Sequence, residues 1–120
     1  MKLNFKSIPA LGLMAALILP GISNAAMCTG NVDYLGIDAS GAVVVRLANS
    51  TPIHLICSVT TQGTFTMTIP SCKASYAAIM SARLVGKKIT LYYNDPALTC
   101  SNLGDWKAVP STYFVQGPED

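Results

Sequence analysis

The chain has 120 residues, with 8 lysines and arginines, 6 aspartates and glutamates, and a formal net charge of +2. Lys2 and Lys6 lie in an N-terminal segment that we expect to be removed, which lowers the basic count to six and leaves a formally neutral chain. A neutral chain of about 95 residues is typical of one domain and lacks the clustered basic face that nucleic-acid binding requires.

The N-terminus has the order of a secretory signal. A short basic segment precedes an apolar run over residues 8–19, which Pro20 and Gly21 end, and small residues follow. This order predicts cleavage after Ala25, with Ala26 as the alternative site. A membrane anchor is the main rival interpretation, but a span needs about 20 apolar residues and this run is shorter.

Export therefore defines the organisation of the chain. We predict a signal peptide over residues 1–25 and a single domain over residues 26–120, located in the periplasm or the external medium. Lipidation of Cys28 is a further alternative, yet the residue before it is Met27, where lipid attachment requires a small side chain. We therefore expect Cys28 to take part in a disulfide.

The cysteine count fits an oxidising environment. Cys28, Cys57, Cys72 and Cys100 form an even set, which in an exported chain indicates a disulfide framework. No C-x-x-C motif occurs, and His54 is the only histidine, so the spacing predicts no metal site and no cofactor. Spacing by itself leaves three pairings open.

The first half of the mature chain reads as strands. Alternating apolar residues predict strands over residues 31–37 and 42–48, joined by a tight turn at residues 38–41. A third strand is predicted over residues 53–60. It is extended by a returning strand over residues 64–69, whose threonines alternate with apolar residues.

The pattern then changes to a helical period. Apolar residues recur at helical spacing over residues 75–85, where the first residue, a serine, suits the N-cap and Gly86 suits the position after the C-terminus. Alternation returns over residues 88–93, and a last strand is predicted over residues 112–116. We expect residues 117–120 to be frayed.

Three strands, one helix and two strands predict a fold that is mainly β with one helix (α+β). This is the order of an OB-type, five-stranded β-barrel with the helix between strands 3 and 4. In such a barrel the first and fourth strands pair antiparallel, which brings Cys28 close to Cys100. Cys57 and Cys72 lie close across the hairpin of the third strand. The architecture therefore predicts the disulfides Cys28–Cys100 and Cys57–Cys72.

A resemblance supports this architecture. It is carried by the two central cysteines, a helix-to-strand signature and the loop that follows, namely Cys57, Cys72, Tyr76, Ala82, Gly86, Lys87, Ile89, Leu91, Cys100 and Trp106. On these residues the chain resembles small secreted proteobacterial proteins of unassigned function. The same signature is similar to the B subunits of pentameric bacterial toxins, which are OB-type barrels that bind host glycans. The resemblance covers roughly residues 28–116, and no glycan-contact motif is carried over.

No catalytic set emerges from the sequence. His54 stands alone at a strand start, and no serine lies in a nucleophile-elbow pattern, so we interpret His54 as structural. Asp38 and Asp95 lie beside turn-forming residues and are interpreted as turn formers. Cys72, next to Lys73, shows the only hint of redox chemistry, and its structural use is favoured.

Aromatic residues give the remaining functional signal, and two of them, Tyr92 and Tyr113, lie on or near the late strands. Trp106 follows Gly and Asp in a polar loop, and the same loop begins with Asn94 and Asp95. These three residues are the predicted ligand-binding residues, since exposed aromatic and polar groups suit sugar stacking or a protein interface. The alternative is that Trp106 plugs one end of the barrel. Tyr34 and Tyr76 are assigned to the core.

The sequence therefore predicts a non-enzymatic exported binding module without a membrane span. Its expected partner is a glycan or a protein, including other copies in a homo-oligomer, and an exposed threonine-rich strand over residues 64–69 would provide an edge for pairing. The alternative function is a small periplasmic enzyme inhibitor, or an enzyme of unspecified reaction.

Overall fold

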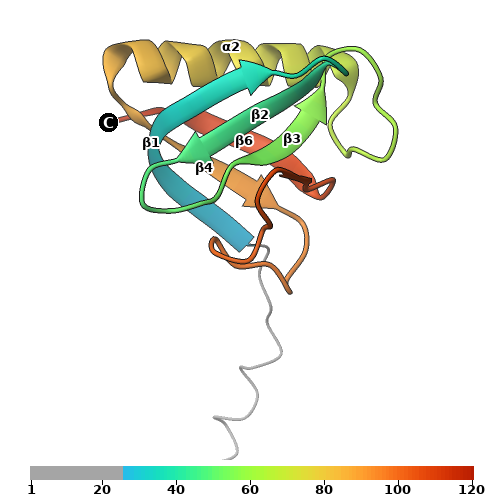
Figure 1. The fold of residues 1–120 in the computed structure, drawn as a ribbon. Coiled ribbons are helices and arrows are strands. Elements are labelled where there is room, and N and C mark those ends of the chain that lie inside the picture. Colours follow the sequence, from blue (N-terminus) through green and yellow to red (C-terminus); the bar gives the residue numbers. More distant parts are fainter. Residues whose placement is uncertain (1–25) are drawn as a thin grey trace, which may run out of the picture.

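The computed structural model describes residues 26–120, so the predicted signal peptide lies outside the described residues. The described residues form a mainly β fold, with one helix and a mixed sheet of six strands (Figure 1). The elements are β1 (Ala26–Ile37), β2 (Ala42–Leu47), β3 (His54–Ser58), α2 (Ile69–Val85), β4 (Lys88–Tyr93), β5 (Lys107–Ala108) and β6 (Thr112–Glu119).

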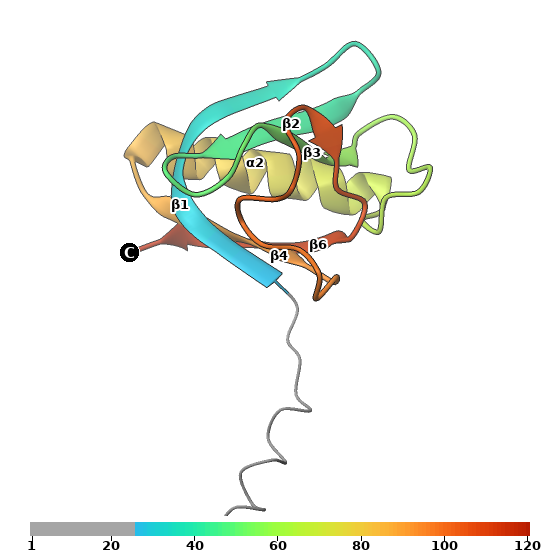
Figure 2. The ribbon, with the colours of Figure 1, turned by 60° about the horizontal axis from the view of Figure 1, so that its bottom comes forward.

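The long strand β1 organises the sheet, whose strand order is β5-β3-β2-β1-β4-β6. Residues 26–31 of β1 pair antiparallel with β4, and residues 32–37 pair antiparallel with β2. The register shifts between Val32 and Tyr34. Figure 2 shows β1 curving between its two partners. This curvature wraps the sheet around one core, and α2 packs against β6 and β1.

Alternation along the strands builds the core. Val43, Val45 and Leu47 of β2 are fully buried on its inner side, as a half-buried strand requires. The largest fully buried side chains are Tyr93, Leu47, Ile56, Ile79, Ile89 and Leu91. Val44 faces the opposite side and is nevertheless only 2% exposed. Part of the outer face of β2 is therefore also shielded from solvent.

The predicted turn between β1 and β2 is confirmed. The Asp38 carboxylate accepts hydrogen bonds from the backbone N–H groups of Ser40 (2.8 Å) and Ala42 (3.0 Å). Gly41 has a φ of +93°, and a Cβ at this position would lie 2.3 Å from Thr60 Oγ1. Both the left-handed backbone and the close approach of Thr60 require glycine here.

The predicted strand over residues 64–69 is wrong. Met67 is buried and the flanking threonines are exposed, so the alternation in burial exists, but this segment is a loop resting on the core. The Oγ1 of Thr68 accepts a hydrogen bond from the Ser71 N–H at 3.3 Å, and Pro70 lies in the first helical turn. Both features start a helix at this point instead of continuing a strand. The proposed pairing edge is therefore not present in this segment.

Helix α2 begins six residues earlier than the sequence predicted. Its N-cap is Thr68 and not Ser75, whereas its end at Gly86, with φ of +70°, is as predicted. The first turns were missed although Cys72, Ile79 and Ala82, the buried residues of α2, recur at helical spacing.

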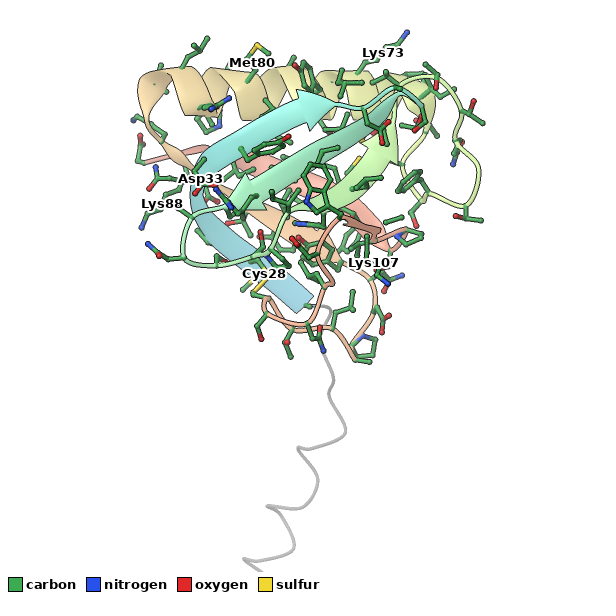
Figure 3. The ribbon with its side chains drawn as sticks, in the orientation of Figure 1. Cys28, Asp33, Lys73, Met80, Lys88 and Lys107 are labelled. Carbon is green, nitrogen blue, oxygen red and sulfur yellow. A yellow bond between two sulfur atoms is a disulfide. The ribbon has the colours of Figure 1, made fainter. Side chains whose placement is uncertain are left out.

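The predicted pairing of the cysteines is confirmed. Cys28 bonds to Cys100, and Cys57 of β3 bonds to Cys72, which lies in α2 and not at the end of a returning strand. Figure 3 shows Cys28 in β1 close to the loop that joins β4 and β5. The first bond therefore ties this loop to β1, and the second ties α2 to the sheet. Disulfides of this kind are typical of an oxidising environment.

The C-terminal part departs from the expected five strands. β5 pairs parallel with β3, β6 pairs antiparallel with β4, and residues 109–111 separate them. Pro110 has no N–H for a ladder, and the Thr112 N–H turns back to the Val109 carbonyl at 3.1 Å. The sheet of the described residues is therefore open and has six strands. The predicted frayed tail is also wrong, because β6 extends to Glu119.

Candidate functional site

Trp106 is held in an exposed and strained position. Its side chain is 53% exposed, so it does not plug the interior of the fold. Its φ of +59° is left-handed, and its N–H donates to the Ile53 carbonyl at 2.6 Å. A bulky residue in this conformation costs about 1–3 kcal/mol, and such strain concentrates at functional positions. The fold therefore holds this indole in an exposed position at a cost in folding free energy.

Tyr34 is the neighbour of Trp106. The two rings meet edge to face, with centroids 5.8 Å apart and planes 81° apart. The sequence assigned Tyr34 to the core, and this was wrong because its side chain is 37% exposed. The irregular register of β1 after Val32 is the local feature that simple alternation could not predict. Tyr76, the other tyrosine assigned to the core, is partly buried against it.

A small cleft of about 80 Å³ lies beside the two rings. It is lined by Tyr34, Gly36, Ile37, Asp38, Val44 and Trp106. Val44, which is buried on the outer face of β2, is part of this lining. The cleft thus combines two aromatic rings, an apolar lining and one carboxylate.

Charged groups surround this cleft. Arg46 Nε and Asp33 Oδ1 form an ion pair at 2.8 Å, with both side chains about two-fifths exposed. The hydrogen bond and the charge of Asp33 raise the pKa of Arg46, and the charge of Asp105 adds to this. The hydrogen bond from the Ser40 side chain is the main cause that lowers the pKa of Asp38. Asp38 is therefore ionised at neutral pH.

Asn94 and Asp95 lie at the other end of the same loop. The Asn94 N–H donates to the Ser111 carbonyl at 2.8 Å, and the Asp95 carboxylate accepts from the Ala97 N–H at 3.0 Å. Neither residue is among those that line the cleft beside Trp106. The structure therefore does not bring the three predicted binding residues together. Asp95 has the turn-forming contact that its sequence neighbours indicated.

His54 is part of the core and not of an exposed site. It is fully buried, with Nδ1 2.9 Å from the Pro52 carbonyl and Nε2 2.7 Å from the Tyr93 hydroxyl. Burial lowers its pKa, while the Pro52 carbonyl acts in the opposite direction. Both ring nitrogens are engaged, so the geometry gives His54 a structural role. Cys72 is fully buried and disulfide-bonded, so it offers no thiol.

A second exposed apolar surface crosses β1, β4 and β6. Met27 pairs in register with Tyr92, and Tyr92 with Phe114, whose ring centroid lies 5.2 Å from that of Tyr92. Tyr113 is also exposed, because the register shifts beside Tyr92. We call Met27, Tyr92, Tyr113 and Phe114 the aromatic row. Sequence analysis named Tyr92 and Tyr113 but not the row, since the row depends on pairing across strands and not on a pattern along one strand.

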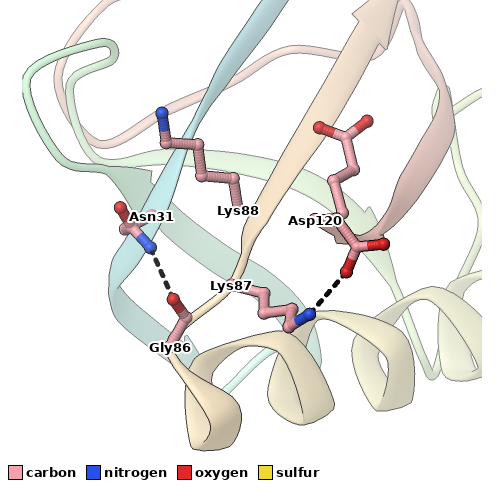
Figure 4. A pocket seen from close by; sticks show the side chains of 6 residues that line it. Asn31, Gly86, Lys87, Lys88 and Asp120 are labelled. Atoms are coloured by element: carbon pink, nitrogen blue, oxygen red, sulfur yellow. Dashed lines mark hydrogen bonds and ion pairs between the residues drawn. The ribbon is translucent and has the colours of Figure 1, made fainter.

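Two larger pockets lie elsewhere. A polar pocket of about 380 Å³ lies where α2 leads into β4, with Asn31, Gly86, Lys87, Lys88, Glu119 and Asp120 along its walls (Figure 4). Lys87 is paired with Asp120, and Asn31 donates to the Gly86 carbonyl. Another pocket, of about 370 Å³, is lined by Leu35, Met80, Arg83 and Leu84.

The described residues contain no group of three or more His, Cys, Asp or Glu placed to hold an ion. Within the same residues, no helix is long and apolar enough to cross a membrane. Comparison with protein-family models, curated proteins and solved structures found no match.

Proposed function

We propose that this chain is an exported, non-enzymatic binding module that takes a carbohydrate on the surface formed by Trp106 and Tyr34. The observation that carries the proposal is the strained, half-exposed Trp106, fixed by its backbone and supported edge to face by Tyr34. A buried tryptophan would contribute to stability, whereas this one leaves about half of its surface to solvent. Flat aromatic faces bordered by polar groups suit the apolar face of a sugar ring.

The test begins with a glycan array and continues with a titration of the best glycan. Trp106 is the only tryptophan in the chain, so its fluorescence reports directly on the proposed site. We expect a saturable change in emission on binding. Tyr113→Ala, in the aromatic row, is the matched aromatic control and should retain binding. A protein that binds no glycan on the array, or that binds with unchanged emission, would contradict the proposal.

A second variant separates binding from folding. Trp106→Gly removes the indole and also relieves the left-handed strain, because glycine adopts positive φ without a penalty. We expect glycan binding to be lost while the free energy of unfolding changes by no more than about 1 kcal/mol. A core tryptophan would instead cost about 3–5 kcal/mol. A loss of that size would assign Trp106 to the core.

A second candidate function is self-association through the aromatic row. Three of its members are 44–60% exposed, namely Met27, Tyr113 and Phe114. None of the four carries a charge, and apolar patches of this kind mark interaction surfaces. An uncharged patch can face a second copy of itself without repulsion. Native mass measurement tests this candidate.

We also infer a relationship to OB-type barrels, in which β5 and β6 are one interrupted last strand. Support comes from the order β3-β2-β1-β4-β6, the helix between the third and fourth long strands, and the three-residue link that joins β5 to β6. The similarity to toxin B subunits depends on this inference. A stable pentamer would favour that similarity, and a monomer would weaken it.

A further inference from the structure

We infer that the group entering the cleft beside Trp106 is an uncharged acetamido substituent, which makes the ligand an N-acetylated hexose and not an acidic sugar. This inference rests on the proposed carbohydrate function and names its substrate class. Three properties of the cleft carry it, namely its acceptor, its local charge and its size.

The acceptor is Asp38. All three hydrogen bonds to its carboxylate end on Oδ1, from the Ser40 N–H, the Ser40 hydroxyl and the Ala42 N–H. Within residues 26–120 no hydrogen bond ends on Oδ2. The side chain is exposed and lines the cleft. An ionised carboxylate only accepts hydrogen bonds, so its free oxygen selects a ligand group with an N–H or O–H.

The local charge disfavours an acidic ligand. The cation nearest to Tyr34 along β2 is Arg46, and Asp33 already pairs with it at 2.8 Å. Asp105 is close enough to act on the same guanidinium. Lys107 packs its stem against Gly104 and does not line the cleft. Carboxylates therefore outnumber the available cations, and a carboxylate on the ligand would be repelled.

The size and lining select the substituent. The cleft, of about 80 Å³, is much smaller than the two other pockets of about 380 and 370 Å³. It suits a group of a few heavy atoms attached to a ring that stacks on Trp106. Ile37 and Val44 supply apolar lining for a methyl group, and Asp38 supplies an acceptor for an N–H. An acetamido group has both features.

Three tetrasaccharides test the inference on the full protein. Chitotetraose carries acetamido groups without charge, cellotetraose lacks acetamido groups, and a hyaluronan tetrasaccharide adds carboxylates. We expect chitotetraose to bind at least about tenfold more tightly than either of the others at low salt. Equal binding of cellotetraose would overturn the acetamido assignment, and preferred binding of hyaluronan would overturn the charge argument, while both would leave a carbohydrate function standing. If none of the three tetrasaccharides bound, both the acetamido inference and the proposed carbohydrate function would be contradicted.

Two variants place the effect in the cleft. A Cβ at Gly36 would meet no atom within 4 Å, so Gly36→Ala adds a methyl group to the cleft without a clash in the protein. Asp38→Asn keeps Oδ1 as an acceptor for the turn and replaces Oδ2 with a donor. Each should weaken chitotetraose about tenfold. The control Asp95→Asn changes an exposed turn aspartate outside the cleft and should bind like wild type. Equal binding by all three variants would overturn the inference.

Discussion

His54 accepts the phenolic hydrogen of Tyr93 in the core, with Nε2 and the hydroxyl oxygen 2.7 Å apart. The assignment of donor and acceptor follows from the other ring nitrogen. Burial lowers the pKa of His54, so the imidazole is neutral at neutral pH in the folded state. Nδ1 lies 2.9 Å from the Pro52 carbonyl, which can only accept, so in the neutral ring Nδ1 carries the hydrogen and Nε2 is the acceptor. Protonation of Nε2 would place a hydrogen against the phenolic hydrogen of Tyr93. It would also place a positive charge in the core.

The first prediction is a loss of stability in mild acid. Burial lowers the pKa of His54 below its ordinary value of 6.5, so the unfolded chain binds a proton more readily than the folded chain. The contribution to stability is complete above pH 6.5 and is lost as the pH falls toward the folded-state pKa. Because one group titrates, the slope is at most about 1.4 kcal/mol per pH unit. Urea unfolding at pH 7.5 and 5.5 measures it.

Proton NMR provides the direct check, because the chain contains one histidine. The ring resonance of the folded protein should titrate with a midpoint below 6.5. A midpoint at or above 6.5 would contradict the prediction. The Asp38 pKa is lowered and changes stability only in stronger acid, so it does not interfere between pH 5.5 and 7.5.

The second prediction concerns the two disulfides. Cys28–Cys100 spans 72 residues and Cys57–Cys72 spans 15. Loop entropy then predicts losses of about 4.5 and 3 kcal/mol when each pair is replaced by alanine. Both losses are a large share of the 5–15 kcal/mol typical of a domain. Urea unfolding of the two double-alanine variants gives the comparison.

Packing reduces the difference in stability loss that loop length predicts between the two disulfides. Cys57 and Cys72 are fully buried, whereas Cys100 is partly exposed, so the shorter loop also loses core contacts. Reduction of the wild-type protein removes the bonds without removing the side chains and separates the two effects. If the reduced protein were as stable as the oxidised one, the disulfides would have no role in holding this fold.

Local patterns predicted the elements that depend on neighbouring residues. The turn at Asp38, the end of α2 at Gly86 and the alternation of β4 each follow from a few adjacent side chains. The disulfide pairing was also predictable, because it follows from the antiparallel pairing of the first strand with the strand after the helix. This strand pairing can be inferred from the order of the predicted elements alone.

Two features were missed for different reasons. Residues 64–69 alternate as a strand does, and this pattern conflicts with the local signals of Thr68 and Pro70, which begin a helix and leave the preceding residues to cover the core as a loop. In contrast, Tyr34 became a site residue only because the β1 register shifts and the distant Trp106 packs against it. Neither the shift nor the contact has a signal in the sequence.

The third prediction concerns the turn between β1 and β2. Gly41→Ala should destabilise the protein by about 1–3 kcal/mol from the strained backbone, with a further cost from the contact with Thr60. Gly63→Ala is the control, because it also has a positive φ, of +53°, but its Cβ would meet no atom within 4 Å. The difference between their unfolding free energies measures the clash. Equal losses would show that Thr60 moves aside freely.

The fourth prediction tests self-association. Native mass spectrometry and sedimentation should detect an oligomer that Phe114→Ser dissociates, because the exposed ring of Phe114 contributes apolar surface to the aromatic row. A stable interface buries about 800 Å² per partner, so loss of one central ring should have a large effect. Leu84→Ser is the matched control, since Leu84 is 80% exposed on α2 and lies outside the row. If Leu84→Ser dissociated the oligomer and Phe114→Ser did not, the interface would lie on α2. A wild-type monomer at every concentration would remove self-association as a candidate.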